Sequence, residues 1–297
     1  MLGWRHKQNR QKPEEASPTD GGRLLPVGDN CRELGGYPLP SAVGRAPGAT
    51  TLSHRFLRSG STSTLSRKEA HYLREYGVTR VVDLRSTQEC ASSPDVFASY
   101  PGVTYTNVPL FGVNLHDPRL HLPGDTRDYL ASGYLRMLDN HEAVRQIFSA
   151  FAEAAPEECV LYHCAAGMDR TGITSMLLLG LCGVGRTSIV ADYTYSFASR
   201  EEADAYIYQG VSPSFTTVDV LARLMGRVYD GLLESYDSVE AYLLSCGITK
   251  SQLARVREVA HHDGERLCGT VLAPAQRLYS LFVERRARQM PSAQPLD

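Results

Sequence analysis

The chain has 297 residues, of which 42% are hydrophobic and 22% are charged, and its formal net charge is −2. This composition is typical of a soluble globular protein with a sizeable core, and the length suits one α/β domain with extensions. The balanced charge argues against a polybasic surface for nucleic acids or membranes. We therefore expect no nucleic-acid partner, and an acidic ligand has to be attracted locally.

The seven cysteines form no C-x-x-C pair, and their odd number does not suggest a disulfide framework. The histidines are not spaced with them as zinc ligands, so we expect no metal and no cofactor. A reducing, cytoplasmic location is favoured, although export by a non-standard route stays open. The most apolar run, residues 172–185, is shorter than the roughly 20 residues that span a bilayer. No transmembrane segment is expected.

Residues 1–28 are rich in Pro, Gly, Gln, Lys and Glu and lack an apolar segment, which favours a disordered tail over a signal peptide. Residues 29–265 are expected to form the functional domain, and residues 266–297 a helical C-terminal extension.

Periodicity and turn residues predict strands and helices along the domain. In chain order they predict a strand at residues 55–61, a helix at 67–77, strands at 78–86 and 102–110, helices at 125–140 and 142–154, a strand at 158–164, and helices at 170–183, 186–198, 238–247 and 249–260. Ser66 and Glu69 have the spacing of a capping box, and residues 110–124 are expected to be a long surface loop. This order predicts an α/β fold, with a small central, mostly parallel sheet flanked by helices and a helical C-terminal part.

The stretch VLYHCAAGMDRTG, at residues 160–172, joins an apolar strand to a hydrophobic helix. Cys164 falls at the end of the strand, where open α/β folds bind ligands. Small residues follow it, so the backbone can curl and its N–H groups can converge on one anion. The residues expected to bind that anion are Ala165, Ala166, Gly167, Met168, Asp169 and Arg170.

A tetrahedral phosphate dianion suits this loop. The helix that begins near Arg170 adds the positive end of its dipole, and the guanidinium can hold two phosphate oxygens. A thiol in such a field ionises readily, so Cys164 is expected to attack the phosphate and form a cysteinyl phosphate that water hydrolyses. Thr171 is placed to donate its hydroxyl to the sulfur. His163 is expected to orient the loop rather than act as a base.

The residues HCAAGMDRTG match the H-C-x5-R-[ST]-G signature of the protein tyrosine phosphatase superfamily. In detail they resemble the bacterial tyrosine/dual-specificity phosphatase family that includes secreted mycobacterial and listerial lipid-and-protein phosphatases. NCRELGGYP, FLRSGS and VVDLRSTQE resemble three upstream segments of that family, and the resemblance covers about residues 30–260. It implies a protein tyrosine phosphatase-like fold, and a phosphorylated protein or peptide as substrate.

Two positions depart from the family pattern. Members usually carry lysine where this chain has Met168, and that lysine is linked to phosphoinositide or general substrate binding. Glu33 replaces an aspartate, which is a mild change.

Two carboxylates are candidates for the general acid that protonates the leaving group. Asp169 lies in the loop, and Asp83 lies at the end of a strand expected to neighbour the catalytic one. The resemblance implies that both take part in catalysis, without dividing the roles. A purely structural pairing of Asp83 with Arg85 stays open, as does substrate steering by Arg85. Ser86 is a candidate helix cap.

Phosphotyrosine is the leading substrate class, with phosphoserine and phosphothreonine as further candidates. A phosphoinositide or inositol-phosphate phosphatase on the same site is the alternative enzyme. A catalytically silent phosphate-binding module is disfavoured because Cys164, Asp169 and Arg170 are all present. A core cysteine beside a surface arginine is disfavoured by the flanking His163 and Gly167. The R-T-G ending argues against rhodanese-type sulfur transfer.

Overall fold

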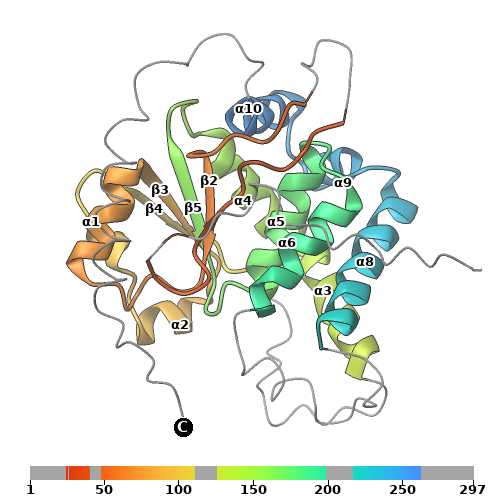
Figure 1. Cartoon of the computed structure of the whole chain (residues 1–297), viewed down its shortest axis with the longest axis horizontal. Helices are drawn as coiled ribbons and strands as arrows, with labels where there is room; N and C mark the ends of the chain where they lie inside the picture. Colours follow the sequence, from red (N-terminus) through yellow and green to blue (C-terminus); the bar gives the residue numbers. More distant parts are fainter. Residues whose placement is uncertain (1–24, 26, 41–47, 111–125, 199–216, 262–297) are drawn as a thin grey trace, which may run out of the picture.

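The computed structural model describes residue 25 and residues 27–40, 48–110, 126–198 and 217–261. A five-stranded sheet lies at its centre (Figure 1), in the order β1-β2-β5-β3-β4. The strands are β1 (Arg32–Glu33), β2 (Phe56–Ser59), β3 (Val78–Asp83), β4 (Thr104–Asn107) and β5 (Cys159–His163). The strands β2, β5, β3 and β4 run parallel, and β1 pairs with β2 in the antiparallel sense. The small, mostly parallel sheet is confirmed.

Helices flank this sheet and make up most of the described residues that follow β5 (Figure 1). Those in the described residues are α1 (Arg67–Tyr76), α2 (Thr87–Ser92), α3 (Thr126–Asp139), α4 (His141–Ala152), α5 (Asp169–Leu181), α6 (Arg186–Ala198), α8 (Thr217–Tyr236), α9 (Val239–Ser245) and α10 (Lys250–Ala260), with a 3₁₀ turn at Val96–Ser99. The predicted helices in this part of the chain are present with small shifts at their ends. Within these residues no helix is long and apolar enough to cross a membrane.

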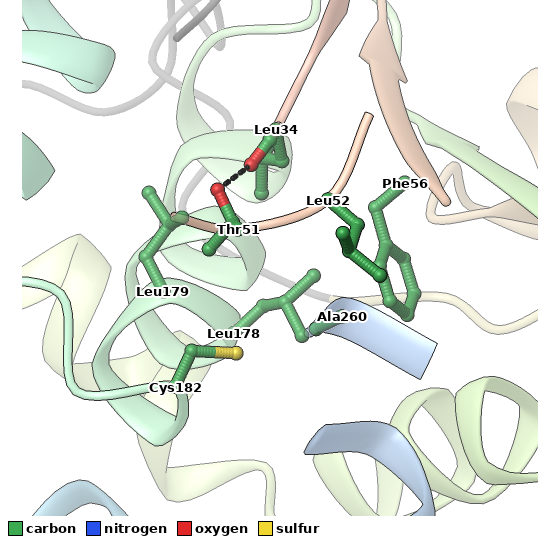
Figure 2. A pocket seen from close by; sticks show the side chains of 8 residues that line it. All are labelled: Leu34, Thr51, Leu52, Phe56, Leu178, Leu179, Cys182 and Ala260. Carbon is green, nitrogen blue, oxygen red and sulfur yellow. Dashed lines mark hydrogen bonds between the residues drawn. The ribbon is translucent and has the colours of Figure 1, made fainter. Parts of the chain in front are cut away.

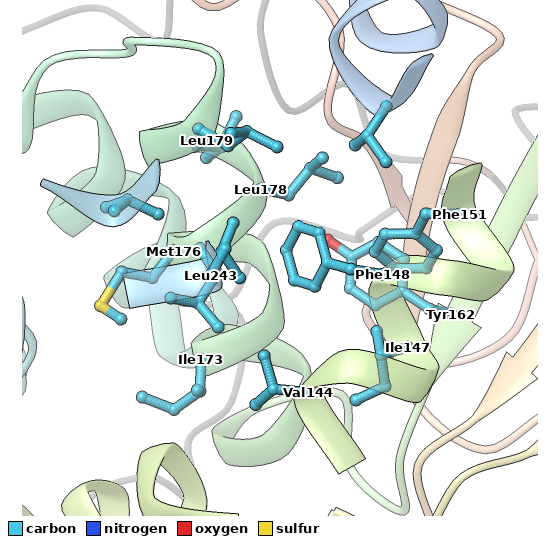
Figure 3. Packing of buried hydrophobic residues seen from close by; sticks show 14 of the residues in the cluster. Val144, Ile147, Phe148, Phe151, Tyr162, Ile173, Met176, Leu178, Leu179 and Leu243 are labelled. Atoms are coloured by element: carbon cyan, nitrogen blue, oxygen red, sulfur yellow. The ribbon is translucent and has the colours of Figure 1, made fainter. Parts of the chain in front are cut away.

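The two faces of the sheet contribute to two separate cores. Side chains alternate along β5, so Val160 and Tyr162 belong to the larger core while Cys159 and Leu161 belong to the smaller one. The larger core lies between the sheet and the helices α4, α5, α8, α9 and α10, and Figure 3 shows some of its side chains. The smaller core packs α1 against the opposite face. Because both faces of β5 are buried, the strand reads as an apolar run in the sequence.

Helix α5 is buried over most of its length and lies at the middle of the larger core. Its glycines allow neighbours to come close. A Cβ on Gly172 would lie 2.8 Å from a ring carbon of Tyr193, and one on Gly180 would lie 2.7 Å from a methyl of Val239. The prediction that the most apolar run of the sequence forms a core helix is confirmed. Burial of α5 in the core also fixes the position of its first turn, next to the loop that precedes it.

The structure differs from the sequence-based prediction at several places, and strand β1 and the long helix α8 were not among the individually predicted elements. Leu25 and Val27, inside the predicted tail, are buried in the smaller core, so they belong to the packed domain. Helix α2 begins after Ser86, whose side chain accepts a hydrogen bond from the Glu89 N–H, so the candidate cap is confirmed although the helix was not among the predicted elements. The loop predicted at residues 110–124 and the extension predicted at 266–297 fall almost wholly outside the described residues.

Candidate active site

The candidate active site lies at the carboxyl edge of the parallel strands. Cys164 directly follows β5, the central strand, and only 3% of its surface is exposed. At the end of β5, His163 is in register with Ser59 on β2 and Asp83 on β3. Residues from three distant segments of the chain therefore meet at the edge where α/β folds bind ligands.

Gly167 gives the loop after Cys164 its shape. Its φ of +71° lies in the left-handed region that favours glycine. The loop also packs closely on the end of β2, because a Cβ at this position would lie 2.5 Å from the Gly60 nitrogen and 2.6 Å from the carbonyl of Ser59. Only glycine fits both the backbone conformation and the space.

Two carbonyl oxygens in this loop have hydrogen-bonding partners that lie outside the loop. The Nδ1 atom of His163 lies 3.1 Å from the Cys164 oxygen, and the Ser61 N–H donates to the Ala165 oxygen at 2.8 Å. In a trans peptide the C=O and the following N–H point in opposite directions. The N–H of Ala166 is therefore directed away from Ser61, as an anion-binding loop requires.

The Arg170 guanidinium is held by a carboxylate in a two-pronged ion pair. Its Nη1 and Nη2 lie 2.8 and 2.9 Å from the two oxygens of Glu89, in the first turn of α2. Burial raises the pKa of Glu89, but hydrogen bonds from Arg170 and from the Ser86 N–H lower it to about 2. Glu89 is thus a fixed anion that orients the Arg170 fork at the start of α5.

Asp83 is fully buried, and its carboxylate forms an ion pair with a second arginine, Arg85. Arg85 donates from Nη2 at 2.7 Å and from Nε at 3.0 and 3.1 Å, and the Tyr105 hydroxyl donates at 2.8 Å. Burial raises the pKa of Asp83, yet Arg85, the nearby His163 and Tyr105 together lower it to about 2. The structural pairing of Asp83 with Arg85 is therefore present.

Asp95 connects this cluster to the histidine of the signature. Its carboxylate lies 3.1 Å from Nε2 of His163 and also accepts a hydrogen bond from Thr62. Asp83, Asp95 and His163 bring potential metal-ligating atoms within 4.8 Å of one another. The Nη2 atom of Arg85 lies 2.7 Å from Asp83 and 3.5 Å from Asp95, so a guanidinium already compensates both carboxylates. The geometry fits an ion-pair network that fixes His163.

Asp169 occupies the first turn of α5 and is half-buried. One of its oxygens accepts a hydrogen bond from the hydroxyl of Tyr134 on α3. That hydroxyl also contacts the hydroxyl of Tyr193 on α6. Asp169 is therefore held in place beside Arg170 while part of its side chain still reaches solvent.

Two further predicted residues lie at the start of α5. Met168 is partly buried and packs against the larger core. The buried hydroxyl of Thr171 has no hydrogen-bond partner within the described part of the chain. The predicted bond from Thr171 to the sulfur of Cys164 stays a prediction.

A small apolar pocket lies near the other end of α5 (Figure 2). It is lined by Leu34, Thr51, Leu52, Phe56, Leu178, Leu179, Cys182 and Ala260. The Thr51 hydroxyl donates a hydrogen bond to the Leu34 carbonyl at 2.7 Å. With no charged group in its lining, the pocket is a gap in the packing and has no connection to the chemistry at Cys164.

Sequence analysis alone did not identify several residues at this site. Glu89, Asp95 and Tyr134 each contact a predicted site residue, and Asn30 and Arg58 contact the loop itself. Glu89 carried a local signal, because its spacing from a preceding serine is that of a capping box, and Asn30 and Arg58 lie in two of the segments that carry the family resemblance.

Comparisons with known proteins agree over most of the chain. A sequence model described as "Tyrosine phosphatase family" matches residues 24–260. A tyrosine-protein phosphatase from Nostoc commune is 30% identical over 235 residues, covering 73% of this chain and 79% of that protein. The triple specificity protein phosphatase PtpB from Mycobacterium tuberculosis is 28% identical over 281 residues, covering 80% of this chain and 98% of PtpB.

Among solved structures, the crystal structure of P. aeruginosa TpbA covers 64% of this chain and 96% of its own, with 17% identity. Its TM-score of 0.30 is too low to support a structural inference.

Proposed function

Because this chain belongs to the tyrosine phosphatase family, we propose that it hydrolyses phosphotyrosine in proteins through a cysteinyl-phosphate intermediate. The observation that carries the proposal is the placement of Cys164 directly before a glycine-shaped loop and the fixed Arg170 fork. A nucleophile at the base of an anion-binding loop is suited to attack a bound phosphate monoester.

The reaction has two steps. The sulfur of Cys164 attacks phosphorus, the bond from phosphorus to the tyrosine oxygen breaks, and a carboxylic acid gives its proton to that oxygen. The resulting carboxylate then takes a proton from water, whose oxygen attacks phosphorus. The phosphorus–sulfur bond breaks, the electron pair returns to sulfur, and inorganic phosphate leaves. Arg170 holds two phosphate oxygens throughout with its Nε–H and the second N–H of Nη2, because the pair with Glu89 uses one N–H from each Nη atom and orients the guanidinium.

We assign the proton transfer to Asp169. It is half-buried, lies in the loop, and is held by Tyr134. Asp83 is completely buried, and the two-pronged contact with Arg85 keeps its pKa at about 2, although burial alone raises it. Hydrogen bonds from Arg85 and Tyr105 already occupy the Asp83 carboxylate, so we assign Asp83 the role of holding Arg85.

Met168 favours a phosphoprotein over a phosphoinositide as the substrate. A phosphoinositide headgroup carries additional negative charge that a cation in the loop would bind. The side chain at position 168 is uncharged and packs partly against the core, so it offers such a headgroup no ion pair. A substrate panel of phosphotyrosyl, phosphoseryl and phosphothreonyl peptides with phosphoinositides measures this preference directly.

The deciding experiment measures phosphate release from a phosphotyrosyl peptide by the wild type, Cys164→Ser and Cys182→Ser. The last is a matched control, because it makes the same atomic change at the opposite end of α5. We expect no turnover for Cys164→Ser, an unchanged rate for Cys182→Ser, and no effect of a chelator. Acid quenching with radiolabelled phosphopeptide is expected to leave label on the fragment that holds Cys164. Equal rates for the wild type and Cys164→Ser would refute the covalent route.

The assignment of the acid has its own test. Asp169→Asn is expected to lower kcat for a phosphotyrosyl peptide by roughly 10²–10⁴-fold. The loss is expected to be much smaller for p-nitrophenyl phosphate, whose leaving oxygen needs little help from a proton. If Asp83→Asn shows this leaving-group dependence and Asp169→Asn does not, the roles of the two carboxylates are reversed.

A further inference from the structure

The carbonyl oxygen of Gly167 accepts two hydrogen bonds from residues far away in the sequence. The Nδ2 atom of Asn30 and the Nη2 atom of Arg58 each donate to it at 2.8 Å. Asn30 lies just before β1 and Arg58 lies within β2. Both lone pairs of this oxygen are therefore engaged from the side of the sheet.

Behind these two donors lies a buried charge network anchored on α6. Arg58 forms an ion pair with Asp192 through Nη1. Arg32 binds the same carboxylate through Nε at 3.2 Å and the Asp192 main-chain oxygen at 2.7 Å. Both guanidiniums also donate to the Ser196 hydroxyl, at 2.8 and 3.1 Å. The network joins α6 to the first two strands.

The same network extends to Asn30. The Nη1 atom of Arg32 donates to the side-chain oxygen of Asn30, which leaves the amide nitrogen directed at Gly167. Asn30 therefore cannot rotate its amide without breaking one of two contacts. The orientation of the Gly167 carbonyl is fixed through two routes, one through Arg58 and one through Arg32 and Asn30.

The described network also carries an excess of positive charge. Arg32 and Arg58 are 0% exposed and Asp192 is 2% exposed. Burial raises the pKa of Asp192, but Arg58 and Arg32 hold it below its usual range, so the aspartate is ionised. Two cations and one anion leave a buried positive charge behind the loop, where the low dielectric screens it less than water does.

The direction of the Gly167 carbonyl also sets the direction of the next N–H group, which belongs to Met168. The Gly167 carbonyl points toward Asn30 and Arg58, so the N–H of Met168 in the same trans peptide points the opposite way. That is the side on which the loop is expected to hold an anion. A carbonyl released from its donors could turn toward the anion and repel it.

We propose that Asn30 and Arg58 are positioning residues for the phosphate loop, held in place by Arg32 and by Asp192 on α6. They keep the Gly167 carbonyl away from the phosphate and the Met168 N–H toward it, and their network places positive charge behind the loop. The inference rests on the proposed function, since it assigns these residues to the same phosphate site. It also explains why two buried arginines are present, since Arg58 contacts the Gly167 carbonyl directly and Arg32 orients Asn30.

The test uses two variants of the full chain. Arg58→Lys keeps the charge but replaces the fork with one ammonium, which cannot serve Asp192, Ser196 and Gly167 together. Asn30→Gly removes the amide while tolerating the backbone φ of +55° at that position. Arg80→Lys is the matched control, because Arg80 lies on β3, which does not pair with β2 in the sheet, and its partner is Glu153 at 3.2 Å.

Three quantities are measured for each folded variant: kcat and KM for a phosphotyrosyl peptide, the dissociation constant of tungstate by calorimetry, and the rate of alkylation of Cys164. Alkylation compares anionic iodoacetate with neutral iodoacetamide by mass spectrometry of the Cys164 peptide. We expect both variants to weaken tungstate binding and to lower kcat/KM by about 10-fold or more. The ratio of the iodoacetate rate to the iodoacetamide rate is expected to fall, and Arg80→Lys to match the wild type.

Wild-type values of all three quantities in both folded variants overturn the inference. A lower melting temperature with unchanged kinetics and tungstate affinity also overturns it, because the role is then structural only. If Arg58→Lys does not fold, Asn30→Gly decides. If the wild type releases no phosphate from peptides but tungstate binding still weakens in the variants, the proposed function fails while the positioning role stands.

Discussion

Substitution of Gly167 by alanine is expected to displace the phosphate loop without unfolding the protein. The new Cβ would lie 2.5 Å from the Gly60 nitrogen and 2.6 Å from the Ser59 carbonyl. Both neighbours are backbone atoms at the end of the sheet, so the loop has to move instead. An ordinary carbon contact of 3.4 Å requires a displacement of about 0.9 Å, which is comparable to the 1 Å misplacement that costs about 10²-fold in rate.

The same substitution carries a second, separable cost. At a φ of +71° an alanine is strained by about 1–2 kcal/mol relative to glycine. The assay measures kcat/KM for a phosphotyrosyl peptide together with the free energy of unfolding in urea. We expect kcat/KM for Gly167→Ala to fall by about 100-fold, while the protein stays folded with stability reduced by at least the strain energy.

Gly102→Ala is the matched control for this prediction. Gly102 has a φ of +75°, but its nearest neighbours are side-chain atoms of Arg74 at 3.6 Å. It therefore shares the backbone strain and lacks the clash, and its kcat/KM is expected to equal that of the wild type. If Gly167→Ala keeps kcat/KM within threefold of the wild type, the loop does not depend on the close approach of Gly167 to β2.

Three further predictions concern charges around the site. Glu89→Gln is expected to lower kcat/KM by about 10-fold, because the Arg170 guanidinium loses its fixed anion. The free energy of unfolding is expected to fall by less than about 1 kcal/mol, because the ion pair is partly exposed. Unchanged kinetics would contradict this role of Glu89. The pKa of Asp83 is raised by burial but lowered to about 2 by Arg85, so its contribution of about 2 kcal/mol is present above about pH 4 and lost as the pH falls through 2. Urea unfolding of the wild type between pH 5 and 2 is expected to show this loss and Asp83→Asn to lack it; equal slopes would refute the assignment. Met168→Lys is expected to raise kcat/KM for phosphoinositides roughly fivefold relative to phosphopeptides, and no gain would count against the proposed substrate preference.

Much of the fold could be predicted from local patterns. Each face of β5 is buried, so its apolar run indicates a central strand, and the apolar sequence of α5 indicates a core helix. The capping pair Ser66 and Glu69 marks the start of α1 and is present in the structure. Helix α2 was marked only by its cap Ser86, because it has six residues and buries none of its side chains and therefore leaves little periodic signal.

The order of the strands depends on longer-range packing. Strand β5 lies between β2 and β3 although about 75 residues separate it from the nearer of the two. Sequence periodicity reports which residues are buried but not which strand they meet. The signature and the strand pattern indicate that Asp83 and His163 lie close together at the ends of neighbouring strands. The contact of Asp95 with that histidine depends instead on a turn after α2.

The sequence by itself determined the chemical groups that lie together in one short segment. Cys164, Gly167, Asp169 and Arg170 fall within seven residues, so a strand, a tight loop and a helix bring them together without any long-range contact. Only the tertiary structure decided what holds that loop in its binding shape. The donors to the Gly167 carbonyl lie 109 and 137 residues away, and no local propensity encodes such contacts, because they form only when the sheet and α6 pack together.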